Sequence, residues 1–204
     1  MTSKAVPFIY LASQSPRRSQ LLDQIGIAHQ ILVADATEDA ESLEIALKNE
    51  APQAYVMRVT GLKLDAAVTR LKTRGLVAVP VLCADTTVAM GRVIYGKPEN
   101  AADAARMLAA LSGKTHRVLT AVAVAHGRKR MSLLSESKVT FATMTKTQIA
   151  SYVATGEPLG KAGSYGVQGM AAGMIARISG SYSGIMGLPL FETTQLLRQI
   201  GFIK

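Results

Sequence analysis

Two serines and two arginines lie close together near the start of the chain, in the segment Leu11-Ala-Ser-Gln-Ser-Pro-Arg-Arg18. Ser15 and Pro16 are typical of the first turn of a helix, where a serine can cap the free N–H groups. Such a helix start attracts anions, and arginine can bind a phosphate through two parallel hydrogen bonds. The segment therefore predicts a phosphate site whose ligands would be Ser13, Arg17 and Arg18. An ordinary capped helix with solvated arginines is the alternative.

A single carboxylate interrupts the most strand-like stretch of the sequence, residues 77–90. Asp85 and Thr86 stand there between apolar residues. Burial of a carboxylate is unfavourable unless it is paired or binds a metal ion. Asp85 is therefore a candidate general base or metal ligand, although an aspartate in a turn or on an edge strand is the more common origin of such a pattern.

The segment Gly91-Arg-Val-Ile-Tyr-Gly-Lys-Pro98 has the spacing of a phosphate-binding P-loop up to its last position. Pro98 takes the place of the Ser or Thr whose hydroxyl would bind magnesium, and it has no N–H group. The pattern also predicts the end of a hairpin instead of a strand-to-helix connection. We reject the P-loop and keep Lys97 as a candidate phosphate ligand, with a solvated turn lysine as the alternative.

Glycines recur every third residue between Gly160 and Gly169, which predicts a loop whose backbone can approach a ligand closely. Gln168 lies in this loop, and its side chain offers both a hydrogen-bond donor and an acceptor. That combination suits the edge of a nucleobase. A flexible loop without a ligand is the alternative.

Apolar periodicity and turn residues predict a mixed α/β architecture, because strands both alternate with helices and form hairpins. We expect helices near residues 16–25, 52–74, 101–111, 145–155 and 189–200. We expect strands near residues 8–12, 31–34, 77–90, 93–95, 116–125, 132–144 and 174–178. Because no repeat, linker or low-complexity tract divides the sequence, residues 1–204 are expected to form one domain.

The composition restricts the partners and cofactors. The chain carries 23 basic and 14 acidic residues, a net charge of +9, which indicates nucleic acid, an anionic membrane or a phosphate-rich small molecule. Its one cysteine, Cys83, excludes a disulfide within the chain, and the three histidines show no ligand spacing. Any metal is therefore expected to be a hard cation held by oxygen atoms. No apolar run approaches the roughly 18 residues of a membrane span, so we expect a cytoplasmic protein.

Several stretches, taken in order along nearly the whole chain, resemble the Maf family of nucleotide pyrophosphatases. They are Leu11–Arg18, Ala84–Val88 with Gly96–Pro98, Gly156–Gly169, and Gly180–Ser183 with Gly187–Leu190. The resemblance implies an elongated, two-lobed α/β fold, with a mixed sheet flanked by helices and a central cleft, like that of inosine-triphosphate pyrophosphatases. It also implies a homodimer and an enzyme that converts a nucleoside triphosphate and water into the monophosphate and pyrophosphate, using Mg²⁺ or Mn²⁺.

The same resemblance implies roles for single residues. Asp85 would be the catalytic carboxylate and a metal ligand, and Glu38 matches an acidic position near the metal. The phosphate-handling positions would be Ser13, Arg17, Arg18, Lys63 and Lys97. Arg17, Thr86 and Gln168 resemble the group that acts on dTTP and UTP. The group that acts on 7-methyl-GTP typically has a bulky aromatic residue in place of Arg17 and an acidic residue in place of Gln168.

Two other classes of protein compete with this interpretation. A basic nucleic-acid-binding module would fit the charge of +9, but no aromatic residues alternate with the arginines to stack on bases. A non-catalytic sensor on the same fold would bind a nucleotide without releasing pyrophosphate. We expect a small-molecule nucleoside triphosphate as the partner, and neither nucleic acid nor a membrane.

Overall fold

The computed structural model describes residues 7–35, 38 and 42–204. In these residues, seven strands form one mixed sheet in the order β2-β1-β3-β5-β6-β7, with β4 paired to β3. β1 is parallel to β2 and β3, and the other pairs are antiparallel. The strands are β1 (Ile9–Leu11), β2 (His29–Ile31), β3 (Val81–Met90), β4 (Val93–Tyr95), β5 (Thr115–His126), β6 (Lys129–Phe141) and β7 (Ile175–Ser179).

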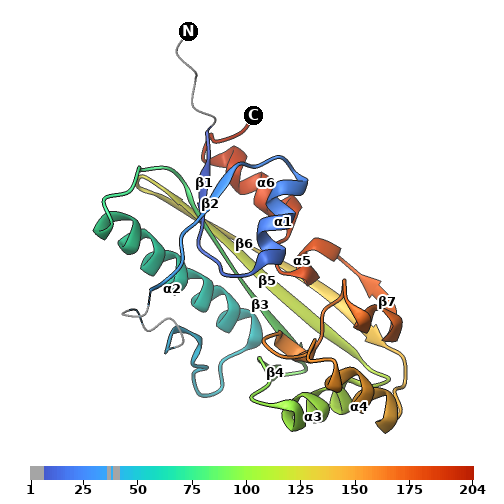
Figure 1. Cartoon of the computed structure of the whole chain (residues 1–204). Helices are drawn as coiled ribbons and strands as arrows, with labels where there is room; N and C mark the ends of the chain where they lie inside the picture. The colour runs from blue at the N-terminus through green and yellow to red at the C-terminus, as the bar shows by residue number, and fades with distance from the viewer. Residues whose placement is uncertain (1–6, 36–37, 39–41) are drawn as a thin grey trace.

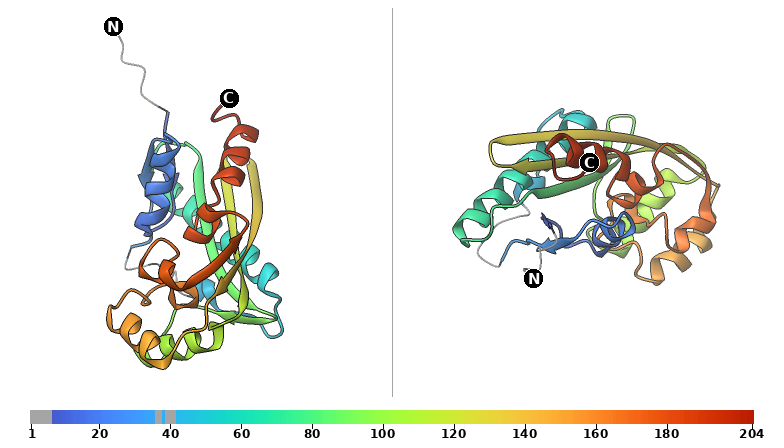
Figure 2. Two further views of the ribbon diagram at one scale, coloured as in Figure 1. Left: turned by 90° about the vertical axis from the view of Figure 1, so that its right-hand side faces the viewer. Right: turned by 90° about the horizontal axis from the view of Figure 1, so that it is seen from above.

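Helices flank this sheet, and the molecule is elongated (Figures 1 and 2). They are α1 (Pro16–Gln24), α2 (Pro52–Thr73), α3 (Ala101–Leu111), α4 (Lys146–Ala154), α5 (Tyr182–Met186) and α6 (Leu190–Gln199). Short 3₁₀ turns lie at η1 (Ser42–Glu44), η2 (Ala162–Ser164) and η3 (Met170–Met174). Figure 1 shows α2 alongside the long strands, α1 and α6 near the chain ends, and α3 and α4 at the opposite end of the sheet.

Successive side chains of a strand point to opposite sides of the sheet, and β3 is buried on both sides. Cys83 belongs to the apolar cluster beneath α2, and Ala84 belongs to the cluster beneath α1 and α6. A further cluster around Phe141 joins α3 and α4 to the far end of the sheet. By the same alternation, the side chain of Asp85 lies on the α2 face of β3 and that of Thr86 lies on the other face.

The mixed α/β architecture and the expected helices are confirmed. The strand expected at residues 31–34 is wrong, since β2 covers His29–Ile31. The partner strand β1 ends at Leu11, opposite Ile31, so residues after this pair leave the sheet. β3 begins at residue 81 instead of 77, directly after Pro80, which has no N–H group to donate. None of the helices among the described residues is long and apolar enough to cross a membrane.

Candidate active site

A cleft of about 910 Å³ opens at a gap in the sheet beside β3. β5 pairs along nearly all of one edge of β3. On the other edge, β1 reaches only to Leu82 and β4 begins only at Val88. Asp85 lies in the middle of the unpaired stretch, and it borders the cleft together with Thr86. The gap explains how a carboxylate within a central strand comes to face a cavity.

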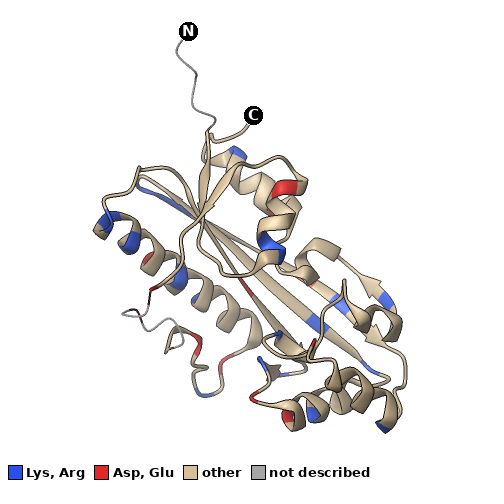
Figure 3. Cartoon of the chain, in the orientation of Figure 1, with Lys and Arg blue, Asp and Glu red and all other residues tan. Residues whose placement is uncertain are grey.

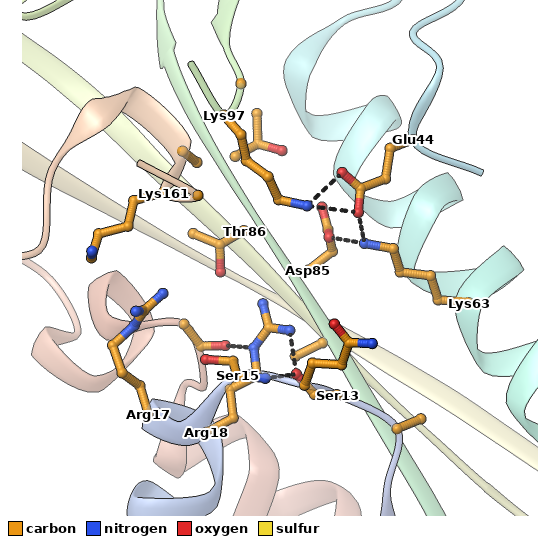
Figure 4. Close-up of a pocket in the computed structure, with 18 of the residues that line it drawn as sticks. Ser13, Ser15, Arg17, Arg18, Glu44, Lys63, Asp85, Thr86, Lys97 and Lys161 are labelled. Carbon is orange, nitrogen blue, oxygen red and sulfur yellow. Dashed lines mark hydrogen bonds and ion pairs between the residues drawn. The ribbon is translucent and has the colours of Figure 1, made fainter. Parts of the chain in front are cut away.

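One wall of the cleft carries a row of alternating charges, which Figure 4 shows. Lys63 of α2 places its Nζ 2.5 Å from Asp85 Oδ1 and 2.7 Å from Glu44 Oε1. Lys97, in the turn after β4, places its Nζ 3.1 Å from Glu44 Oε2. Two carboxylates and two ammonium groups from separate parts of the chain therefore meet at the open edge of β3.

The pairing on this wall keeps its charges in place at neutral pH. Burial by itself would lower the pKa of Lys63, but the charges and hydrogen bonds of Asp85 and Glu44 raise it above its ordinary value. Burial by itself would raise the pKa of Glu44, but its contacts with Lys63 and Lys97 lower it. Lys63 therefore stays protonated and Glu44 stays ionised.

The start of α1 forms the opposite wall. Arg18 Nε donates to Gly187 O at 2.7 Å, and its Nη1 donates to Ser13 Oγ at 3.0 Å. Ser13 Oγ also accepts a hydrogen bond from the backbone N–H of Ser15 at 3.1 Å. Ser15 precedes α1 as expected, but its side chain makes no capping hydrogen bond, so that expectation is wrong. Ser13 orders this turn instead and fixes the guanidinium of Arg18.

Two further cations face each other beside this wall. Figure 4 shows Arg17 of α1 and Lys161 of the glycine-rich loop on the side of the cleft away from Lys63. Burial and the charge of Arg18 lower the pKa of Arg17. Burial and the charge of Arg17 lower the pKa of Lys161. Because cations crowded in a partly buried corner repel one another, a bound anion would stabilise them, and the corner suits a polyphosphate.

The loop between Gly160 and Gly169 borders the cleft and brings Gln168 to it. The N–H of Gly163 donates to Gly96 O at 3.0 Å, which ties the loop to the turn that carries Lys97. Gly163 has φ +69°, and a Cβ there would lie 2.8 Å from a methyl group of Val88, so the contact leaves no room for a side chain. Gln168 is exposed at the cleft, where its amide could meet a nucleobase.

Glu38 lies in the same cleft but belongs to another ion pair. Arg70 of α2 donates from Nε to Glu38 Oε1 at 2.7 Å and from Nη2 to Oε2 at 2.6 Å. The hydrogen bonds from Arg70 lower the pKa of Glu38. The role of Glu38 at a metal stays a prediction, and Glu44, which shares Lys63 with Asp85, is a competing candidate for that role.

Glu44 and Asp85 form a carboxylate pair that fits a divalent cation. An oxygen of each contacts the same positive charge, the ammonium of Lys63. Across residues 7–35, 38 and 42–204, no group of three or more His, Cys, Asp or Glu residues could hold a metal ion. Mg²⁺ is usually held by one or two carboxylates together with substrate phosphates and water. The pair therefore fits a cation that binds together with a phosphorylated ligand.

Comparison with known proteins identifies the family. The profile of the family described as "Maf-like protein" matches residues 8–200. The chain belongs to the Maf family. A protein of Albidiferax ferrireducens named dTTP/UTP pyrophosphatase is 67% identical to this Maf protein, over 96% of this chain and 98% of the relative. A protein of the same name from Cupriavidus metallidurans is 58% identical, over 95% and 96% of the two chains. A solved HAM1 protein from Coxiella burnetii aligns with a TM-score of 0.44 and 12% identity, over 68% of this chain and 75% of that chain.

The cleft of this Maf protein brings together every site residue predicted from the sequence. They are Ser13, Arg17, Arg18, Glu38, Lys63, Asp85, Thr86, Lys97 and Gln168. Sequence reasoning missed Glu44 and Lys161, which also line the cleft. Lys161 stands within the glycine-rich motif and could have been found there. Glu44 lies in an acidic stretch without periodicity, so only its contact with Lys63 marks it.

Proposed function

We propose that this Maf protein is a nucleoside triphosphate pyrophosphatase that hydrolyses dTTP and UTP to the monophosphate and pyrophosphate. The observation that carries the proposal is the position of Asp85, at the gap in the sheet and between two walls that both carry basic side chains. The names of relatives that are 58 and 67% identical agree with this activity. A cleft of about 910 Å³ has room for a nucleotide of this size.

In the proposed reaction, a water molecule attacks the α-phosphorus in line with the bond to the leaving pyrophosphate. A new bond forms from the water oxygen to phosphorus while the bond to the bridging oxygen breaks. Asp85 orients the water and accepts its proton, and Lys63 holds the carboxylate in place at 2.5 Å. Arg17 and Arg18 stabilise the charge that develops on the pyrophosphate.

Glu44 and Asp85 would hold the divalent cation in this scheme, which would polarise phosphoryl oxygens and offset their charge. Two carboxylates suit Mg²⁺ or Mn²⁺, since either ion can complete its coordination with phosphate oxygens and water. Lys97 would contact the phosphates as a point charge, because its side chain is 59% exposed beside Glu44.

In this proposal, the loop that carries Gln168 selects the pyrimidine base. Its amide can donate and accept on the edge of a base. Thr86 belongs to the proposed nucleotide site as well. Its hydroxyl lies 3.0 Å from that of Thr120, which donates to Gly184 O at 2.7 Å, so the hydroxyl of Thr86 has a fixed neighbour.

Pyrophosphate release from a panel of nucleotides tests the proposal. The panel contains dTTP, UTP, CTP, 7-methyl-GTP and ITP, each with Mg²⁺ or Mn²⁺. We expect dTTP and UTP to give the highest kcat/KM. A preference for 7-methyl-GTP would overturn the assignment to the dTTP/UTP group. Absence of pyrophosphate release from every nucleotide would overturn the proposed enzymatic activity.

The role of Asp85 is tested in the same assay. Asp85→Asn should lower kcat by about 10²- to 10⁴-fold, the usual contribution of a general base, while the circular dichroism spectrum stays unchanged. The matched control is Asp65→Asn. Asp65 is an exposed aspartate of α2 that pairs with Arg130, and it does not line the cleft. Near-normal turnover of Asp85→Asn would remove Asp85 from the mechanism.

The two rival classes give different results in simple experiments. Figure 3 shows basic residues distributed over α1, α2, the long strands and the α3–α4 end. A nucleic-acid-binding module would show salt-dependent DNA binding and no triphosphate turnover. A sensor would bind nucleotide and release no pyrophosphate.

We also infer that residues 1–204 act as one domain, because β3 contributes to the core at both ends of the molecule, with Leu82 in one cluster and Val88 in another. The homodimer that the family resemblance implies stays a prediction. Light scattering of the full chain in solution tests it.

A further inference from the structure

Glu157 lies outside the cleft but holds the loop that carries Gln168. Its Oε2 accepts a hydrogen bond from the N–H of Met170 at 2.9 Å, directly beyond the end of the loop. Its Oε1 accepts a hydrogen bond from the hydroxyl of Tyr152 in α4 at 2.9 Å. Its backbone carbonyl accepts a hydrogen bond from Nζ of Lys161, at the start of the loop. One residue thus connects both ends of the loop to α4.

Close contact between Glu157 and Gly169 adds a steric constraint. A Cβ on Gly169 would lie 2.2 Å from Glu157 Oε1 and 2.5 Å from its Cδ, so the loop backbone lies against the carboxylate. Tyr152 OH also accepts a weak hydrogen bond from the N–H of Gly166 at 3.4 Å. Gln168 therefore stands between a buried residue, Val167, and a glycine that touches Glu157.

The chemistry of these contacts requires a carboxylate. An ionised carboxylate only accepts hydrogen bonds, and here both of its oxygens face donors, the N–H of Met170 and the hydroxyl of Tyr152. Burial by itself would raise the pKa of Glu157, but these hydrogen bonds and the charge of Lys161 lower it. The pKa of Tyr152 is raised by burial and by Glu157, so its hydroxyl keeps the proton that it donates.

From this geometry we infer that Glu157 is a positioning residue for nucleotide selection, which acts by fixing the loop so that Gln168 meets the base. The inference rests on the proposed function, and it assigns the control of base selectivity to a residue that does not touch the nucleotide. Loss of the carboxylate frees Met170 and Gly169, and the adjacent Gln168 then samples several positions. Affinity and selectivity for the base should fall, whereas the reacting groups around Asp85 keep their arrangement.

The first experiment compares KM, kcat and selectivity in matched variants. Glu157→Ala should raise KM for dTTP about tenfold, as expected for the loss of charge-assisted hydrogen bonds, with kcat changed less than threefold. In the same variant, the ratio of kcat/KM for dTTP to kcat/KM for CTP should fall. Glu157→Gln keeps one acceptor oxygen, so its effect should be smaller. The control is Glu136→Gln on β6, whose carboxylate pairs with Arg117 at 3.5 Å outside the cleft.

A double-mutant cycle separates a direct contact from a general loss of structure. Gly169→Ala in the natural chain drives a methyl group into the carboxylate of Glu157 and should raise KM. In the Glu157→Ala background the carboxylate is gone, so the same methyl group should add little further change. Independent, additive effects of the two substitutions would contradict the inference.

Two measurements keep the outcomes distinct. Tyr152→Phe removes the hydroxyl that donates to Glu157, and it replaces Glu157→Ala in the comparison if that variant does not fold. Tyr152→Phe should also raise KM for dTTP. Calorimetric Kd values for α,β-methylene-dTTP give the same comparison without turnover, so the test stays valid even if the proposed reaction fails. KM, Kd and the dTTP-to-CTP ratio within twofold of the natural chain in all of these variants would overturn the role of Glu157.

Discussion

Nζ of Lys63 lies 2.5 Å from Oδ1 of Asp85, and this contact links α2 to the open edge of β3. The same ammonium lies 2.7 Å from Glu44 Oε1, so one cation is shared by two carboxylates that would otherwise repel each other. The Lys63 side chain is only 20% exposed, and Asp85 and Glu44 keep it charged by raising its pKa against the effect of burial. A divalent cation that enters between these carboxylates would have to compete with it.

Removal of the Lys63 charge should therefore separate metal affinity from turnover. Lys63→Met keeps a long side chain without a charge and leaves Glu44 and Asp85 facing each other. We expect Mn²⁺ to bind more tightly in the absence of nucleotide, measured by electron paramagnetic resonance, while kcat falls about 10²-fold because Asp85 loses its fixed partner. Lys72→Met, at an exposed position of α2, is the control. Weaker Mn²⁺ binding together with unchanged kcat would show that Lys63 does not compete with a cation.

Two glutamates of the cleft should respond differently when each is neutralised. Glu44→Gln should weaken Mn²⁺ binding about tenfold or more, because Glu44 shares the site with Asp85. Glu38→Gln should leave Mn²⁺ binding unchanged and lower the free energy of unfolding by about 1 kcal/mol, because Arg70 is 8% exposed and loses its charged partner. Isothermal titration and urea unfolding measure the two effects. The reverse pattern would place Glu38, and not Glu44, at the metal.

Helices and strands were predictable where their ends are determined by residues close together in the sequence. Asn100 accepts a hydrogen bond from the N–H of Asp103 at the start of α3, as its type and position predict. Thr145 and Gln148 form a capping box at the start of α4, the arrangement that a threonine followed three residues later by a glutamine favours. The end of β2 was not predictable, because it depends on where the partner strand β1 stops and not on the apolar residues that follow Ile31.

The site was predictable to the extent that single residues stand out from their surroundings. Asp85 does so, as a carboxylate in an apolar strand. Glu44 does not, because its partner Lys63 is 19 residues away and no pattern connects the two. The contact between Arg18 and Gly187 joins residues 169 positions apart, so only the family resemblance, which includes both segments, could suggest that they meet.

Gly187 should be required for the backbone that holds Arg18. Its φ of +119° disfavours any other residue, and its carbonyl accepts the hydrogen bond from Arg18 Nε. A Cβ would meet Arg18 and Thr86 only at 3.5 Å, so the cost of Gly187→Ala is backbone strain and not a clash. We expect the free energy of unfolding to fall by about 1–3 kcal/mol in urea titrations, with a higher KM for dTTP. Gly173→Ala is the control, since nothing lies within 4 Å of a Cβ there and its φ is not in the left-handed region. Equal stability of the two variants would contradict the prediction.

Stability should depend on pH through a buried histidine of β5. His116 is 1% exposed, its Nε2 lies 2.8 Å from Tyr165 OH, and burial lowers its pKa from 6.5 to about 4. The unfolded chain binds a proton below pH 6.5 that the folded chain takes up only near pH 4, so the free energy of unfolding should fall as the pH drops through this window, by up to about 3 kcal/mol. Carboxylates with a lowered pKa, such as Glu38, add to the loss only near and below their ordinary value of 4.5. Urea unfolding of the natural chain and of His116→Gln between pH 7.5 and 5 measures the difference. If the free energy of unfolding falls equally steeply with decreasing pH in both proteins, the pH dependence belongs to other groups. If the free energy of unfolding of His116→Gln does not change with pH, the dependence belongs to His116.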